Sequence, residues 1–177
     1  MSDENARPPE IADGRTAFEW DSKYDDKARK RMAKEAIYIA AVFILSFVLL
    51  FLNYRGVLSR WLSRDEETLL TIEYIAYFSI AGLLGGNVFG IKFFYRAVAR
   101  GSWHMDRIYW RIFSPFVSMA VALIVGVMIS TGILAVHNDT TNLWAIAFGF
   151  FAGYFADEAV GKMYDIATLL FGKTKQM

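Results

Sequence analysis

Residues 36–54 read AIYIAAVFILSFVLLFLNY, an uninterrupted stretch without a charged side chain. The hydrocarbon core of a bilayer is about 30 Å thick and a helix rises about 1.5 Å per residue, so about 20 mostly apolar residues cross it. Between 42 and 52 the only polar side chain is Ser46. A helix of a soluble protein has a polar face at a spacing of 3.6 residues, and this stretch has none. It therefore predicts a membrane-spanning helix.

Three further apolar stretches follow the same pattern. The second is uncharged from 74 to 91 and its helical periodicity begins near 68, the third is the longest, and the fourth is the shortest. We predict an all-α fold with four membrane-spanning helices, at about 35–54, 69–92, 112–136 and 141–158. We expect the fourth helix to continue past Asp157. Apolar residues at helical spacing then predict an amphipathic helix over 159–172, at the membrane surface or packed against other copies.

Composition supports a membrane protein and argues against several other classes. Of 177 residues, 55% are apolar and 21% charged, and the mean hydropathy is +0.30, too apolar for a soluble domain of this length. A net charge of +1 gives no indication of a nucleic-acid partner. The chain has no cysteine and two histidines, His104 and His137, which fall in loops on opposite sides of the membrane. We predict no catalytic residue, metal site or cofactor, and therefore not an enzyme.

Basic residues predict the orientation. Sixteen Lys and Arg flank the spans on the side that holds both termini, against three on the other side. Loops rich in Lys and Arg stay in the cytoplasm. Both termini are thus expected to be cytoplasmic, in a multi-pass protein of a bacterial inner membrane.

The segment before the first span divides into two parts. Residues 1–24 are rich in acids and contain Pro8-Pro9, which predicts a disordered cytoplasmic tail. Its aromatic residues, Phe18, Trp20 and Tyr24, either anchor the chain at the membrane interface or dock on a neighbouring subunit or partner. Ser22 and Asp25 resemble a capping box, so a helix is expected to start near Asp25 and run directly into the first span.

Two surface features flank the spans. Lys92, Arg96 and Arg100 lie four residues apart and form a basic stripe, which Gly101-Ser102 ends. Such a stripe attracts anionic lipid headgroups or forms a docking surface for a soluble cytoplasmic partner. On the outer side, apolar residues between 57 and 62 share one helical face and predict a short interfacial helix.

Small residues line one face of three spans. A face of this kind lets two helices approach closely in lipid. The residues concerned are Gly82, Gly86 and Gly90 in the second span, Gly126 in the third, and Gly149 and Gly153 in the fourth. Packing within one four-helix bundle accounts for some of these rows. Because three rows exceed what one bundle needs, we also predict homo-oligomers that associate through these glycines, in the manner of a glycine zipper.

Three polar residues at membrane depth are candidate functional residues. Glu73 lies about one turn inside the outer end of the second span, where it reaches water, pairs with Arg64, or joins a ring of carboxylates at a pore mouth. Asn87 stands beside the glycine row and is able to hydrogen-bond across subunits. Asp157 continues the small-residue row of the fourth span inward, and with Glu158 it is expected to face Lys162 or Arg111.

One stretch carries a resemblance. Residues 149–172, GFFAGYFADEAVGKMYDIATLLFG, resemble the ends of small multi-pass bacterial inner-membrane proteins of unassigned role. Some of these are linked to defence or signalling systems, and the four-span membrane subunit of the Kiwa anti-phage system is similar in architecture. The resemblance implies a sensor, anchor or pore-forming effector, and no catalytic residue follows from it.

These observations together predict a non-enzymatic, homo-oligomeric membrane protein that acts as a sensor or anchor and recruits a cytoplasmic partner. The alternative is an ion channel or pore lined by the second or fourth span. A small proton-coupled transporter is a third reading.

Overall fold

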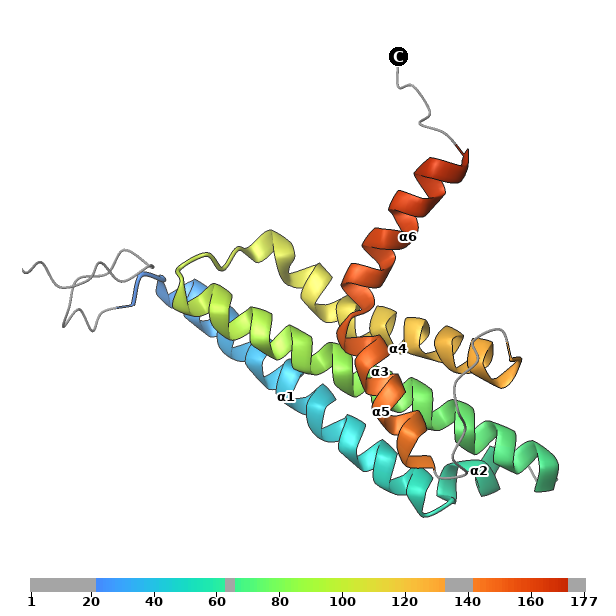
Figure 1. Ribbon diagram of the computed structural model, residues 1–177. Helices are drawn as coiled ribbons and strands as arrows, with labels where there is room; N and C mark the ends of the chain where they lie inside the picture. Colours follow the sequence, from blue (N-terminus) through green and yellow to red (C-terminus); the bar gives the residue numbers. More distant parts are fainter. Residues whose placement is uncertain (1–21, 63–65, 133–141, 172–177) are drawn as a thin grey trace, which may run out of the picture.

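The computed structural model describes residues 22–62, 66–132 and 142–171, and within these ranges every regular element is a helix (Figure 1). The predicted all-α fold is therefore confirmed. In chain order the helices are α1 (Asp26–Tyr54), α2 (Val57–Leu62), α3 (Glu66–Ala99), a short 3-10 turn (Met105–Arg107), α4 (Ile108–Ser130), α5 (Asn142–Tyr154) and α6 (Ala156–Phe171).

Three helices are long and apolar enough to cross a membrane: α1, α3 and the segment formed by the 3-10 turn and α4. A fourth crossing is present if α5 and the start of α6, which are bent by 63° at Phe155, count as one span. The expectation that the fourth helix continues unbroken past Asp157 is thus wrong. The amphipathic helix begins at Ala156, and α6 turns away from the other helices (Figure 1).

Helix α3 is the centre of the bundle. It packs against α4, α5 and α1, while α1 and α4 hardly contact each other. In the most apolar part of each helix, 67% of the residues of α3 are buried, against 22% for α1. Phe78 and Ala81 of α3 are completely buried, and Phe78 packs against Trp144 of α5.

The outer surfaces of α1 and α4 are apolar and uncovered. On α1, the side chains of Ile37, Ile44 and Phe51 are 69%, 63% and 61% exposed. Apolar area of this extent in water would cost about 25 cal/mol for each Å². Exposing the same apolar area to hydrocarbon has no such free-energy cost, so these surfaces are suited to helices that face lipid.

Helix ends follow from local sequence. Asp25 is the N-cap of α1, and its carboxylate accepts a hydrogen bond of 2.8 Å from the amide of Ala28. The helix start near Asp25 is confirmed, although Asp25 and not Ser22 caps it. Gly56 (φ 63°) follows α1 and Gly101 (φ 68°) follows α3, both in the left-handed conformation that glycine adopts without strain. The short helix predicted between 57 and 62 is also confirmed, as α2, while its place at the outer membrane surface stays a prediction.

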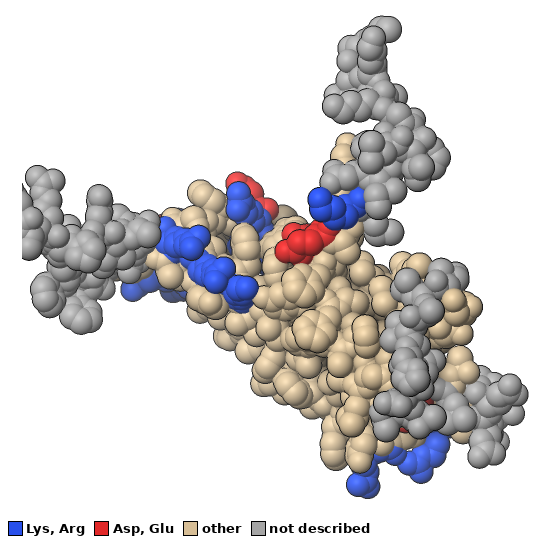
Figure 2. Space-filling model, viewed as in Figure 1, with Lys and Arg blue, Asp and Glu red and all other residues tan. Residues whose placement is uncertain are grey.

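The two ends of the bundle differ in charge. The start of α1, the end of α3 and the start of α4 lie together and carry most of the described Lys and Arg; we call this the basic end (Figures 1 and 2). Helix α2, with Arg60, and Arg55 at the end of α1 lie at the opposite end, which we call the α2 end.

The predicted orientation has a direct test because the chain lacks cysteine. Trp61 at the α2 end is 89% exposed, and Ser102 at the basic end is exposed as well. We expect a membrane-impermeant maleimide to label Trp61→Cys in spheroplasts, and Ser102→Cys only after permeabilisation, because the basic end is expected to face the cytoplasm. The reverse labelling pattern would overturn the orientation.

Candidate functional site

The most unusual polar group of the molecule is an ion pair buried at the basic end. Glu35 of α1 and Arg111 of α4 are 76 residues apart, and each side chain is only 1% exposed. Arg111 Nε donates to Glu35 Oε1, and Arg111 Nη2 donates to Glu35 Oε2 over 3.2 Å. This bidentate geometry is the strongest form of a carboxylate–guanidinium contact.

The loop between α3 and α4 completes the surroundings of this pair. Trp103 Nε1 donates to Glu35 Oε2 over 2.9 Å, and the backbone oxygen of His104 accepts from Arg111 Nη2 over 3.2 Å. The guanidinium carbon of Arg111 lies 5.6 Å from the centre of the Trp103 ring, within the range of a cation–π contact. Each carboxylate oxygen therefore has a donor, and only Nη1 of Arg111 is buried without an acceptor.

Tyr24 ties the segment before α1 to the same place. Its hydroxyl accepts from the backbone amide of Trp103 over 3.0 Å and donates to the carbonyl oxygen of Ala97 over 3.3 Å. Of the three aromatic residues predicted to anchor or dock, Tyr24 thus docks on its own chain. Phe18 and Trp20 lie outside the described residues.

We call Tyr24, Glu35, Trp103 and Arg111 the inner clamp. A buried ion pair often adds little net stability, because removing both charges from water costs about as much as their attraction returns. Its effect is to fix geometry, since either charge alone would be buried without compensation. The clamp thereby joins the ends of α1 and α4, two helices that hardly contact each other elsewhere.

Sequence reasoning missed the inner clamp, although a signal for it existed. Glu35 directly precedes the apolar block of the first span, and Arg111 directly precedes that of the third. Both spans start from the same side, so the two charges lie at the same depth. The sequence instead suggests Arg111, or alternatively Lys162, as the partner of Asp157 and Glu158.

The predicted basic stripe is divided in the structure. Lys92 is half-buried, donates to the hydroxyl of Tyr154 over 2.8 Å and lies 5.6 Å from the centre of that ring. Arg96 and Arg100 are exposed and extend along the last turns of α3. Lys92 thus connects α3 to the end of α5, and only Arg96 and Arg100 remain available at the surface.

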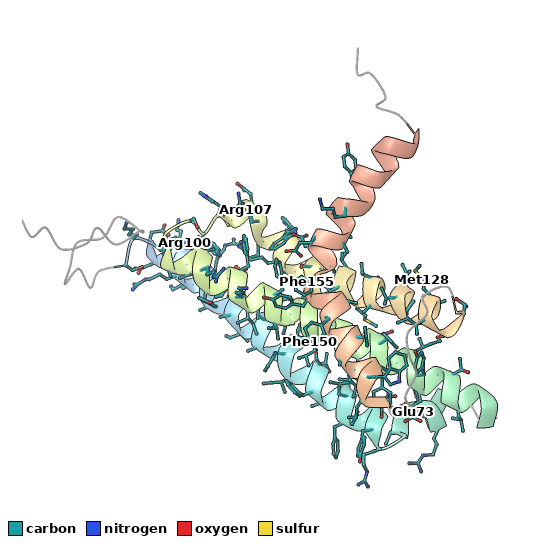
Figure 3. The ribbon with its side chains drawn as sticks, viewed as in Figure 1. Glu73, Arg100, Arg107, Met128, Phe150 and Phe155 are labelled. Carbon is teal, nitrogen blue, oxygen red and sulfur yellow. The ribbon has the colours of Figure 1, made fainter. Side chains whose placement is uncertain are left out.

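Glu73 lies at the other end of the bundle (Figure 3). Its carboxylate is half-buried and accepts from the hydroxyl of Tyr77 over 3.4 Å and from the amide of Asn142 over 3.5 Å. These contacts connect α3 to the start of α5. The alternative partner Arg64 lies outside the described residues.

Asn87 and Asp157 have separate surroundings. Asn87 is 1% exposed, and its amide donates to the carbonyl oxygen of Ile39 in α1 over 3.0 Å, so the hydrogen bond expected across subunits is made within the chain. Asp157 is exposed in the first turn of α6. The structure therefore does not bring Glu73, Asn87 and Asp157 together in one chain, and a pore lined by them would need several copies.

The glycines make contacts within one chain. A Cβ added to Gly82 would overlap Ala122, and one added to Gly86 would overlap Ser118, both in α4. Toward α5, a Cβ on Gly153 would lie 2.6 Å from the Cα of Gly82, and a Cβ on Gly149 would lie 2.7 Å from the carbonyl oxygen of Phe78. Both α4 and α5 therefore pack closely against the glycine positions of α3, and they also contact each other.

Gly126 and Gly90 complete the predicted set. A Cβ on Gly126 would lie 2.7 Å from the Phe78 ring, so this glycine also packs within the chain. Gly90 differs, because nothing lies within 4 Å of an added Cβ. The predicted interface between copies is thus already occupied at every glycine of the set except Gly90, because both α4 and α5 pack closely against α3 within the chain.

Within the described ranges, no group of three His, Asp or Glu side chains is placed to hold a metal ion. Compared with known proteins, the chain matches no family model, no curated protein and no solved structure.

Proposed function

We propose that this chain is a non-enzymatic inner-membrane protein that serves as an anchor or sensor and recruits a soluble cytoplasmic partner with an acidic surface. The observation that carries this proposal is the inner clamp. It joins the ends of α1, α3 and α4 into one fixed surface below the apolar part of the bundle. A fixed surface binds with less loss of conformational entropy than a flexible one.

Charge supports the same proposal. Figure 2 shows Lys and Arg gathered at the basic end, separated from those of the α2 end by a surface without charged side chains. Arg96 and Arg100 on α3 and Arg107 before α4 are exposed there. Figure 3 places Arg100 and Arg107 on the two sides of the loop that contains Trp103. Complementary charge steers a partner toward such a surface and selects against partners of the wrong sign.

We also propose that the protein acts as a homo-oligomer in a bacterial defence or signalling system, as the resemblance of residues 149–172 implies. Because α4 and α5 occupy most of the glycine contacts, copies would meet through another surface. The exposed apolar side of α1, with Ile44 and Phe51, is one candidate.

Neutralising two exposed arginines tests the recruitment proposal. Exposed charges contribute up to about 1 kcal/mol each, so Arg96→Gln with Arg100→Gln is expected to reduce capture of the partner about tenfold. The measurement is a quantitative pull-down from the native host with the full-length protein in detergent. The control is Arg55→Gln with Arg60→Gln at the α2 end, which removes the same charge and is expected to leave capture unchanged.

Two results would contradict the proposal. Equal losses in both double variants would mean that overall charge, and not the basic end, causes capture. Ion conductance of the purified protein in a planar bilayer, absent in Glu73→Gln, together with no captured soluble protein, would instead support the pore.

A further inference from the structure

A cavity of about 200 Å³ lies between the start of α1 and the start of α4, beside the inner clamp. With about 30 Å³ for each water molecule in the liquid, this volume corresponds to about six waters, enough for a small polar headgroup. The residues that line it are Arg31, Lys34, Glu35, Tyr38, Ile108 and Ile112. Arg31 and Lys34 are exposed, so the cavity opens at the surface of the basic end.

The cavity is positively charged. Its single carboxylate, Glu35, is paired with Arg111 and receives a further hydrogen bond from Trp103. Among the described residues, neither Arg31 nor Lys34 forms an ion pair. Within the described ranges, two cations thus remain without a counter-charge beside a carboxylate that is already neutralised.

The other walls are apolar. Ile108 and Ile112 of α4 are half-buried, and the Tyr38 hydroxyl donates to the carbonyl oxygen of Ile112 over 2.9 Å, which turns the ring of Tyr38 toward α4. Two further apolar residues lie toward the middle of the bundle. In α1, Leu45 lies two turns beyond Tyr38 on the same helix face, and in α4, Phe116 lies one turn beyond Ile112 on the same helix face. Both are 50% exposed.

The depth of the cavity matches a lipid headgroup. Lys34 lies two residues before the apolar block of α1, so the two cations stand at the boundary between hydrocarbon and water. Basic pockets between membrane helices on the cytoplasmic side are suited to anionic headgroups.

We infer that this cavity binds the phosphate headgroup of an anionic phospholipid from the leaflet at the basic end. Arg31 and Lys34 contact the phosphate, the guanidinium of Arg31 with two parallel N–H donors. One acyl chain lies along the apolar faces that contain Leu45 and Phe116. A free phosphate or a phosphorylated metabolite would use the cations and leave the apolar walls without a function, so the walls favour a lipid.

Native mass spectrometry of the delipidated full-length protein in detergent tests this inference. Phosphatidylglycerol and phosphatidylcholine are compared with the same acyl chains. We expect the first phosphatidylglycerol molecule to bind about tenfold more strongly than the first phosphatidylcholine, because two interfacial cations without a counter-charge attract its net negative charge. Arg31→Gln with Lys34→Gln is expected to remove this preference. The matched control, Lys27→Gln with Lys30→Gln, removes two charges from exposed positions earlier in α1 that do not line the cavity, and the preference is expected to remain.

A second variant separates shape from charge. Ile108→Trp fills the cavity without changing its charge, and we expect it to weaken phosphatidylglycerol binding while leaving the unfolding temperature of the protein within a few degrees. Glycerol 3-phosphate, which has the headgroup without the acyl chains, is expected to compete poorly even in large excess.

Three results would overturn the inference. The first is an equal loss of preference in both double variants, which would indicate general attraction to the basic end. The second is effective competition by glycerol 3-phosphate, which would identify a soluble phosphate site. The third is unchanged phosphatidylglycerol binding in Ile108→Trp. Each result is independent of whether a soluble partner is recruited, so this inference and the proposed function fail separately.

Discussion

Replacing Arg111 with alanine is expected to lower the free energy of unfolding by about 3–5 kcal/mol, because the carboxylate of Glu35 then stays buried without its counter-charge. Trp103 Nε1 would be its only remaining donor among the contacts described here. The measurement is unfolding of the purified protein in mixed micelles with increasing sodium dodecyl sulfate, followed by tryptophan fluorescence or circular dichroism. Trp103 lies in contact with both members of the pair and is one of five tryptophans, so circular dichroism serves as the second, independent readout.

The chain provides a matched control for this prediction. Asp26 and Arg29 also form an ion pair, but their side chains are 78% and 58% exposed. Arg29→Ala is therefore expected to cost less than about 1 kcal/mol. Glu35→Leu combined with Arg111→Met should recover most of the lost stability, because no charge is then left buried. If Arg111→Ala costs no more than Arg29→Ala, the inner clamp does not hold α1 and α4 together.

Gly153→Ala has the second large expected effect. The new methyl group would lie 2.6 Å from the Cα of Gly82, where only backbone atoms are present and no flexible side chain is able to move away. Overpacking in a tight core costs about 1–3 kcal/mol and sometimes more. We expect a loss at the upper end of this range, measured by the same unfolding experiment, together with weaker packing of α5 on α3.

Gly90→Ala is the control from the same set of glycines. Nothing lies within 4 Å of its added Cβ, and alanine is a better helix former than glycine, so this variant is expected to gain about 0.5–1 kcal/mol. It also tests self-association, because Gly90 is the one glycine of the set that the chain's own helices leave open. If Gly90→Ala separates oligomers into single copies without loss of stability, copies meet at this face of α3.

Much of the fold was predictable because bilayer thickness and helical rise fix the length of a span. The uncharged block at 36–54 and the residues Asp25, Gly56 and Gly101 locate α1 and the end of α3 to within a residue or two. Each of these signals is local: an apolar run, a capping carboxylate, or a glycine that adopts a positive φ without strain.

The break after α5 was not predictable in the same way. The residue at the bend, Phe155, is not a helix breaker such as proline, and the residues around it are compatible with a helix. The bend coincides with the change from the apolar surface of α5 to the charged first turn of α6 at Asp157 and Glu158. Its position depends on where α5 stops packing against α3, which is a tertiary property.

The candidate site shows the same limit. Glycine spacing indicated that a second helix approaches Gly82 and Gly86 closely, but spacing alone does not show whether that helix belongs to the same chain. The partner of Arg111 was also not predictable. Its partner must lie at the same depth in the membrane, and the rotation of its helix must turn its side chain toward Arg111. Asp157 lies at a suitable depth but does not face Arg111, whereas Glu35 does both.

The length of α5 has a mechanical consequence for the surrounding lipid. Its 13 residues extend about 20 Å before the bend, some 10 Å less than the usual hydrocarbon thickness. A bilayer adapts to such a short segment by thinning, at a fraction of a kcal/mol for each Å. Two copies that share one thinned zone deform less lipid than two copies apart. If α5 lies across a bilayer in this way, the elasticity of the bilayer is expected to favour copies that lie close together, without a complementary protein surface.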